Sequence, residues 1–271
     1  MKRTLLLLTT LAAGIGLAGA QETLSLKGSD TLGSKMVPQM AEAFKSAGNA
    51  VKFEIAAEGS ATAFPALAGG TAQIGMSSRQ IKDEERTLCK TKGVFLKEHK
   101  ACYDMIVVVV NKNNPIDNLT PAQVSKLFTG GVKDWSEVGG RPGAVSVYTR
   151  NTSSGTYKDW QKLAMGGKDY GPASQKMAGN EQIAEEVSKN PNGIGYVGHG
   201  FSGKPGLKAV KIGGLEPTVS NLKKYPYSRP CFFYAPDKPT PMAAKFLEFA
   251  ASEKADAIVR QAGFIPVKEA E

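Results

Sequence analysis

The chain has 271 residues, of which 41% are hydrophobic, and a formal net charge of +9. This length suits two moderate domains better than one, and the composition is that of a globular protein. The charge favours anionic partners. The lysines are scattered rather than grouped with aromatic residues, and no nucleic-acid motif accompanies them, so a solvated basic surface is expected and nucleic-acid binding is not.

The N-terminus has the pattern of a secretory signal peptide. Met1-Lys-Arg3 is followed by an uncharged apolar stretch up to Leu17 and then by Ala18-Gly-Ala20. A positive start, a short apolar core and an A-x-A end predict cleavage after Ala20 and a mature protein in the periplasm. The apolar stretch is too short to span a membrane, and the absence of a cysteine after Ala20 argues against a lipid anchor.

The chain contains three cysteines, Cys89, Cys102 and Cys231. In an oxidising compartment Cys89 and Cys102 could close a short loop and leave Cys231 as a buried thiol, although the spacing does not decide the pairing. No C-x-x-C motif is present and there are only two histidines. Neither a metal site nor another cofactor is therefore expected.

Taken in order, the first part of the chain repeats a pattern of strand, polar turn and helix. Apolar residues alternate in the short segments and recur at helical spacing in the longer ones. The predicted pairs are strand 24–26 with helix 32–46, strand 51–57 with helix 63–67, and strand 74–76 with helix 81–88.

The apolar run Tyr103–Val110 predicts a buried central strand, after which a second α/β pattern begins. This run and the segment 225–234 are interpreted as two crossings between lobes. Lobe I then comprises 21–108 with 228–271, and lobe II, residues 109–227, is inserted in it. The later predicted elements are helices 121–128, 157–164, 183–189 and 242–261 and strands 144–149, 193–197 and 231–235.

Three of the predicted turns carry small hydroxyl residues at the start of a helix: 29–32, 59–62 and 153–156. In the third, Gly155 lets the backbone approach a ligand, and the helix start offers free N–H groups at its positive end. Arg150 adds a planar fork of donors. If the turns meet between the lobes, they surround an oxyanion with donors while Arg150 and Arg79 balance its charge. An ordinary Ser N-cap beside a solvated arginine is the alternative for the third turn.

Four segments, in this order and spacing, resemble the periplasmic phosphate-binding proteins of ABC phosphate importers. They are Gly28-Ser-Asp-Thr-Leu32, Glu58-Gly-Ser-Ala-Thr62, Ile74-Gly-Met-Ser-Ser-Arg79 and Arg150 to Thr156. The resemblance covers nearly all of the mature chain. It implies an α/β fold of the type II periplasmic-binding-protein architecture, with two lobes that are each a mixed sheet flanked by helices. It further implies a monomer without enzymatic activity that captures inorganic phosphate in the interlobe cleft and delivers it to a membrane permease.

By this resemblance, phosphate is held by residues from all three turns. Ser78 stands where many members carry an aspartate, whose carboxylate accepts the proton of hydrogen phosphate and repels sulfate. Asp30 is then either the replacement acceptor or a plain N-cap. The implied contacts are Thr31, Leu32, Ser60, Arg150, Ser154, Gly155 and Thr156, and the predicted site also includes Ser29, Asp30, Ser78 and Arg79.

Three other functions stay open at this point. The same architecture could hold another oxyanion, such as sulfate or molybdate. A secreted phosphatase would use Ser154 as nucleophile and His199 as base, but the chain has neither a G-x-S-x-G motif nor a cluster of metal ligands. An adhesion or scaffold protein would use the basic face, and its binding would weaken steeply with salt.

Overall fold

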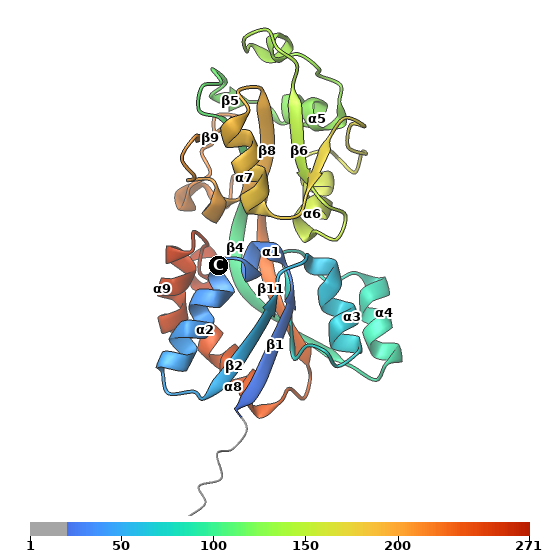
Figure 1. Cartoon of the computed structure of the whole chain (residues 1–271), viewed down its shortest axis with the longest axis vertical. Coiled ribbons are helices and arrows are strands. Elements are labelled where there is room, and N and C mark those ends of the chain that lie inside the picture. The colour runs from blue at the N-terminus through green and yellow to red at the C-terminus, as the bar shows by residue number, and fades with distance from the viewer. Residues whose placement is uncertain (1–20) are drawn as a thin grey trace, which may run out of the picture.

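The computed structural model describes residues 21–271, so the predicted leader lies outside the described residues. The chain forms two lobes, one above the other in Figure 1, joined by the long strand β4 and its neighbour β11. The strands are β1 (Glu22–Gly28), β2 (Val51–Ala56), β3 (Ile74–Ser77), β4 (Leu96–Asn111), β5 (Asn118–Leu119), β6 (Ser146–Arg150), β7 (Gln175–Met177), β8 (Gly193–Gly198), β9 (Leu207–Ala209), β10 (Lys211–Ile212) and β11 (Ser228–Pro236).

Helices flank the sheet in both lobes, as the predicted α/β architecture requires. The α-helices are α1 (Asp30–Gly33), α2 (Met36–Ser46), α3 (Ala63–Ala68), α4 (Asp83–Thr91), α5 (Pro121–Thr129), α6 (Gly155–Leu163), α7 (Asn180–Lys189), α8 (Pro241–Ala250), α9 (Glu253–Gln261) and α10 (Val267–Ala270). The short 3₁₀ helices are η1 (Ser60–Thr62), η2 (Trp135–Val138), η3 (His199–Phe201) and η4 (Val219–Asn221).

One sheet runs through both lobes in the order β2-β1-β3-β11-β4-β8-β6-β7, and β9 also pairs with β4. The lower part of β4, up to Met105, pairs antiparallel with β11, and its upper part, from Ile106, pairs antiparallel with β8. In the lower lobe β1 is parallel to β2 and β3, and in the upper lobe β6 is parallel to β7 and β8. The carboxyl ends of each parallel set therefore meet at one edge, where α/β proteins bind ligands.

Each lobe has its own hydrophobic core, and the connecting strands pass from the lower-lobe core into the upper-lobe core. On β4 the change falls between Cys102 and Met105, and near β11 it falls between Tyr227 and Cys231. In the lower lobe, a larger cluster under α2, α8 and α9 and a smaller one under α3 and α4 cover opposite faces of the sheet. Ile265, near the C-terminus, belongs to the upper cluster, and the lobe boundaries at 108/109 and 227/228 stay a prediction.

Two predicted helices are each divided in the structure. Residues 32–46 form the end of α1 and then α2, and residues 242–261 form most of α8 and then α9. Ser252 is the N-cap of α9, and its hydroxyl accepts a hydrogen bond from Ala255 N at 3.4 Å. Apolar spacing continues through both breaks, so the spacing alone did not reveal the new helix start.

Within residues 21–271 the three cysteines are buried, unbonded thiols. Cys89 lies on α4 in the smaller lower-lobe cluster, whereas Cys102 lies on β4 in the larger one. Because these clusters cover opposite faces of the sheet, the short-loop pairing of Cys89 with Cys102 considered from the sequence does not fit this fold.

Candidate functional site

The structure brings the three hydroxyl-bearing turns together between the lobes. The second and third turns interlock, because Ala61 N donates to Ser153 O at 3.0 Å and Ser153 Oγ donates to Glu58 O at 2.8 Å. The first and third turns meet where the Thr31 and Thr156 hydroxyl oxygens lie 3.0 Å apart. Each turn follows the carboxyl end of a strand in a parallel set, so the topology explains why residues far apart in sequence converge here.

Gly155 allows the start of α6 to approach the lower lobe. A Cβ atom at this position would lie 2.3 Å from Ser60 Oγ and 2.7 Å from Ser78 Oγ. Ser78 N donates to Ser60 Oγ at 3.0 Å, and the two hydroxyl oxygens lie 3.3 Å apart. Two buried hydroxyls of the lower lobe thus face the positive end of an upper-lobe helix.

Arg150, at the end of β6, is a buried cation with unsatisfied donors. Its side chain is 1% exposed, which excludes the solvated arginine considered from the sequence. Nη2 donates to Ala178 O at 3.0 Å, and Nη1 lies 3.1 Å from Asp30 Oδ2 without the geometry of a hydrogen bond. Nε also has no partner among the described residues. Burial lowers the pKa of Arg150, and the Asp30 carboxylate opposes that shift.

Asp30 connects the lobes. Its Oδ2 accepts hydrogen bonds from Asn180 N at 3.0 Å and from Asn180 Nδ2 at 2.7 Å, at the start of the upper-lobe helix α7. The N-cap position of α1 belongs to Ser29, so the interpretation of Asp30 as a plain N-cap was wrong. The carboxylate instead accepts hydrogen bonds at the N-terminal end of helix α7 in the other lobe and forms an ion pair with Arg150.

A second buried arginine, Arg229 on β11, reaches the same site from the connecting strands. Nη2 donates to Asp104 Oδ2 at 2.9 Å and to Thr156 Oγ1 at 2.9 Å, while Nη1 donates to Asp159 Oδ2 at 3.3 Å. A guanidinium only donates hydrogen bonds, so the Thr156 hydroxyl cannot donate its proton to Arg229. The Thr156 hydroxyl proton therefore points toward Thr31 or toward a ligand.

Sequence reasoning missed Asn180, Asp104, Arg229 and Asp159. The signal for Asp104 was present, because a charged residue inside the apolar run that leads to Val110 needs a buried partner. Its partner, Arg229, is 125 positions away, and Asn180 is 150 positions from Asp30. Local patterns do not carry such pairings.

Other predicted site residues have roles within the protein. Ser154 is the N-cap of α6, and its oxygen accepts a hydrogen bond from Tyr157 N at 3.2 Å, which leaves the hydroxyl proton available. Leu32 is buried on α1. Ser29 Oγ is buried without a partner among the described residues. Arg79 forms a two-pronged ion pair with Glu85, at 2.5 and 2.8 Å, and lies over the Phe64 ring.

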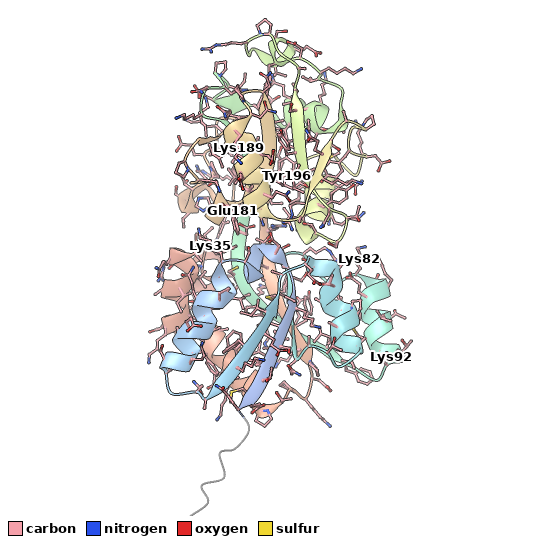
Figure 2. The ribbon with its side chains drawn as sticks, viewed as in Figure 1. Lys35, Lys82, Lys92, Glu181, Lys189 and Tyr196 are labelled. Carbon is pink, nitrogen blue, oxygen red and sulfur yellow. The ribbon has the colours of Figure 1, made fainter. Side chains whose placement is uncertain are left out.

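At one edge of the lobe boundary, a cavity of ≈ 530 Å³ is lined by residues of both lobes, including Lys35 and Glu181. Figure 2 shows Lys35 at the upper end of the lower lobe and Glu181 at the lower end of the upper lobe. Lys35 Nζ donates to Gly200 O and lies over the Phe201 ring. None of the residues of the three turns lines this cavity, so we regard it as a groove at the rim and not as the anion site.

Two kinds of feature are absent from residues 21–271. No group of three or more histidine, cysteine or acidic side chains is arranged to hold a metal ion. No helix in this range is long and apolar enough to cross a membrane.

The comparisons with known proteins agree with this geometry. Residues 16–254 match the family described as the PBP superfamily domain, so the architecture is that of a two-lobed binding protein. The chain is also 33% identical to the phosphate-binding protein PstS of Pseudomonas aeruginosa, over 98% of this chain and 95% of that protein. It therefore belongs to the PstS family of phosphate-binding proteins.

Solved structures give the same result. A putative phosphate ABC transporter substrate-binding protein from Clostridium perfringens, with bound phosphate, is 32% identical with a TM-score of 0.84, over 91% of this chain and 100% of that chain. An ABC-type phosphate transport receptor from Vibrio cholerae is 26% identical with a TM-score of 0.73, over 89% of this chain and 99% of that chain. The predicted two-lobed α/β fold is confirmed.

Proposed function

We propose that this protein is a non-enzymatic, extracytoplasmic solute-binding protein that captures inorganic phosphate between its lobes and delivers it to an ABC importer. The observation that carries the proposal is the buried Arg150 guanidinium, whose Nε and Nη1 have no hydrogen-bond acceptor among the described residues. A buried cation with free donors is stabilised by an anion that accepts from them. Membership of the PstS family supports phosphate as that anion.

Phosphate in this site would bind donors from both lobes. From the lower lobe come the hydroxyls of Thr31 and Ser60, and from the upper lobe the Arg150 guanidinium, the Ser154 hydroxyl and the first N–H groups of α6. A ligand that contacts both lobes stabilises the closed state by its differential affinity for that state. Among the predicted site residues, Asp30 would act indirectly, through its ion pair with Arg150. Both Nη atoms of Arg79 donate to Glu85, and only its Nε lacks a partner among the described residues, so we expect Arg79 to contribute less than Arg150.

Selectivity against sulfate needs an acceptor for the proton of hydrogen phosphate. Asp30 Oδ2 already accepts from Asn180 and contacts Arg150. The other carboxylate oxygen, Oδ1, accepts no hydrogen bond among the described residues and is one candidate acceptor. The paired hydroxyls of Ser60 and Ser78, which face the start of α6, are the other. A hydroxyl can either donate or accept, so it rejects a fully deprotonated anion less strictly than a carboxylate does. We expect phosphate to be preferred and sulfate to compete weakly.

The proposal also includes where the protein acts and which partner receives the phosphate. The predicted leader directs the chain to the periplasm, where it acts as a monomer and transfers phosphate to a membrane permease. The phosphatase alternative has little support, because no hydrogen bond joins Ser154 to His199 within residues 21–271. The His199 Nδ1 atom lies 2.9 Å from Gly263 O instead.

Calorimetric titration of the ligand-stripped mature protein tests the ligand. Phosphate is titrated at two pH values, and then sulfate and molybdate are added as competitors. Tight phosphate binding with weak competition supports the proposal. If sulfate bound as tightly as phosphate, the site would be a general oxyanion site and not one selective for phosphate. If none of the three anions bound, the proposed function would be refuted.

A further inference from the structure

Two of the three cysteines face each other on the strands that connect the lobes. Cys102 on β4 and Cys231 on β11 are direct partners in the antiparallel register. Both are 0% exposed, and both belong to the larger hydrophobic cluster of the lower lobe. Because partners at one register position project to the same face of a sheet, the two thiols share one region of the core.

The backbone geometry of such a pair suits a covalent bond. Directly opposed residues of antiparallel strands have Cα atoms about 4.5–5.5 Å apart. A disulfide accepts Cα separations of about 4.4–6.8 Å, so the strands need no large movement to be bridged. The register shifts directly after Cys231, where the ladder is already irregular.

Cys89 differs in each of these respects. It lies on α4 in the other lower-lobe cluster, and its thiol donates to Phe64 O at 3.4 Å. It therefore serves as an internal reference for a thiol that stays reduced.

We propose that Cys102 and Cys231 form a cross-strand disulfide in the exported protein. The proposal depends on export to an oxidising compartment and not on the identity of the ligand, so it can fail while the proposed function holds. In an antiparallel pair at the junction of two lobes, the bond closes a loop, residues 102–231, that contains the upper-lobe strands β5 to β10. It stabilises the fold by restricting the unfolded chain.

The reaction is a thiol–disulfide exchange with a disulfide-bearing oxidant of the compartment. The thiolate of one cysteine attacks a sulfur of the oxidant, forms a mixed disulfide and releases one oxidant thiolate. The second cysteine, after losing its proton, attacks the mixed disulfide and releases the other. Two thiols thus lose two protons and two electrons, and the oxidant disulfide becomes a dithiol.

The exchange must take place before the lower core closes. Burial, reinforced by the neighbouring Cys231 thiol, raises the pKa of the Cys102 thiol well above its ordinary value. In the folded chain the reactive thiolate is therefore suppressed and the oxidant has no access. Oxidation during folding avoids both obstacles, since the two strands pair while the thiols are still exposed.

The position of the bond also limits where the connecting strands bend. Two register positions further along, Asp104 faces Arg229, and beyond them the core changes to that of the upper lobe. A bond between Cys102 and Cys231 holds the strands together on the lower side of this ion pair. Bending that separates the lobes is then confined to the segments above the bond.

Alkylation with mass measurement tests the proposal on the protein as it is made. The full chain is expressed with its own leader, isolated from the periplasm without reductant and denatured in iodoacetamide. We expect one alkylated cysteine before reduction and three after it, with peptide mapping that places the bond between Cys102 and Cys231. Three alkylated cysteines before reduction, or a bond that includes Cys89, would overturn the proposal.

Two variants make the count specific. In C89S, no cysteine is alkylated before reduction and two are alkylated after it. In C102S, the remaining two cysteines are alkylated whether or not the sample is reduced. A C102S chain that still protects Cys231 from alkylation would contradict the assigned pairing. Because the samples are denatured before alkylation, burial alone does not protect a thiol.

Discussion

The lobes meet at two buried arginines whose donors are satisfied to different extents. Arg229 on the connecting strand β11 donates to Asp104, Asp159 and Thr156 at distances of 2.9–3.3 Å. Arg150, at the end of β6, makes one side-chain hydrogen bond, to Ala178 O, and its Nε and Nη1 have no hydrogen-bond partner among the described residues. Both side chains are almost completely buried.

This difference separates a structural arginine from one that binds a ligand. A buried charge whose donors are all engaged is compensated within the protein, and it fixes the elements that it joins. A buried charge with free donors is costly unless something else accepts from them. By this criterion Arg229 organises the junction of the lobes and Arg150 contacts the anion, and the variants below test that division.

R150A should have the largest effect, on phosphate affinity. Loss of two charge-assisted hydrogen bonds costs about 3–6 kcal/mol, which weakens binding by more than about a hundredfold. Titration calorimetry measures the affinity, and circular dichroism checks that the fold is kept. R141A is the matched control, because it removes an exposed arginine and should leave the affinity unchanged. Equal affinities of R150A and the parent protein would remove Arg150 from the site.

R229A should act mainly on stability. Removing one partner of a buried ion pair leaves Asp104 uncompensated, and this loss costs about 3–5 kcal/mol in the free energy of unfolding. Phosphate affinity should fall less than in R150A, because Thr156 keeps its hydroxyl. Urea denaturation and calorimetry give the two quantities.

The double variant R229M/D104L sharpens this assignment. Replacing both charges by apolar groups of similar size removes the uncompensated carboxylate, so much of the lost stability should return. A double variant as unstable as R229A would show that the cost arises from something other than the charge left on Asp104.

Part of this arrangement was predictable from the sequence. Arg150 follows a β-branched run and precedes Ser154-Gly-Thr156, so its position at a strand end and beside a helix start was visible locally. The meeting of the turns followed from the parallel strands, whose carboxyl ends share an edge. What local pattern did not contain was the pairing across lobes, such as Asp30 with Asn180.

For Arg79, the sequence failed to indicate a pairing with a residue that is close in the chain. From the sequence Arg79 was expected, together with Arg150, to balance the charge of an oxyanion held between the lobes. In the structure Glu85, six positions later on α4, pairs with its guanidinium. The competing acceptor was visible in the sequence, but its orientation depends on how α4 packs. The contacts of Arg79 do not test its predicted part in binding phosphate, and its ion pair with Glu85 favours the lesser role proposed above.

D30N should have an intermediate effect. The substitution keeps the shape of the side chain but removes the charge that accompanies Arg150 and one acceptor of Asn180, at a cost of about 1–2 kcal/mol. Phosphate affinity should therefore fall by roughly tenfold. Sulfate affinity should fall by the same factor, because Asp30 acts through Arg150. A loss confined to phosphate would mean that Asp30 accepts the proton of the ligand.

D159N should have the smallest effect, and it depends on pH. Burial raises the pKa of Asp159 above its ordinary value, and the attraction of Arg229 only partly offsets this. The folded state therefore holds the Asp159 proton more tightly than the unfolded state does, and the contribution to stability, present at low pH, is lost as pH rises through the raised pKa.

At neutral pH the ionised Asp159 is thus mildly unfavourable, and D159N should be more stable than the parent protein by up to about 1 kcal/mol, the scale of a partly exposed ion pair. The difference should shrink as pH falls through the raised pKa of Asp159, where the parent protein becomes neutral at this position as well. Urea denaturation at a series of pH values measures it. A variant less stable than the parent at neutral pH would show that the ionised Asp159 stabilises the protein through Arg229. Arg229 would then depend on both of its acidic partners, which would widen its contrast with Arg150.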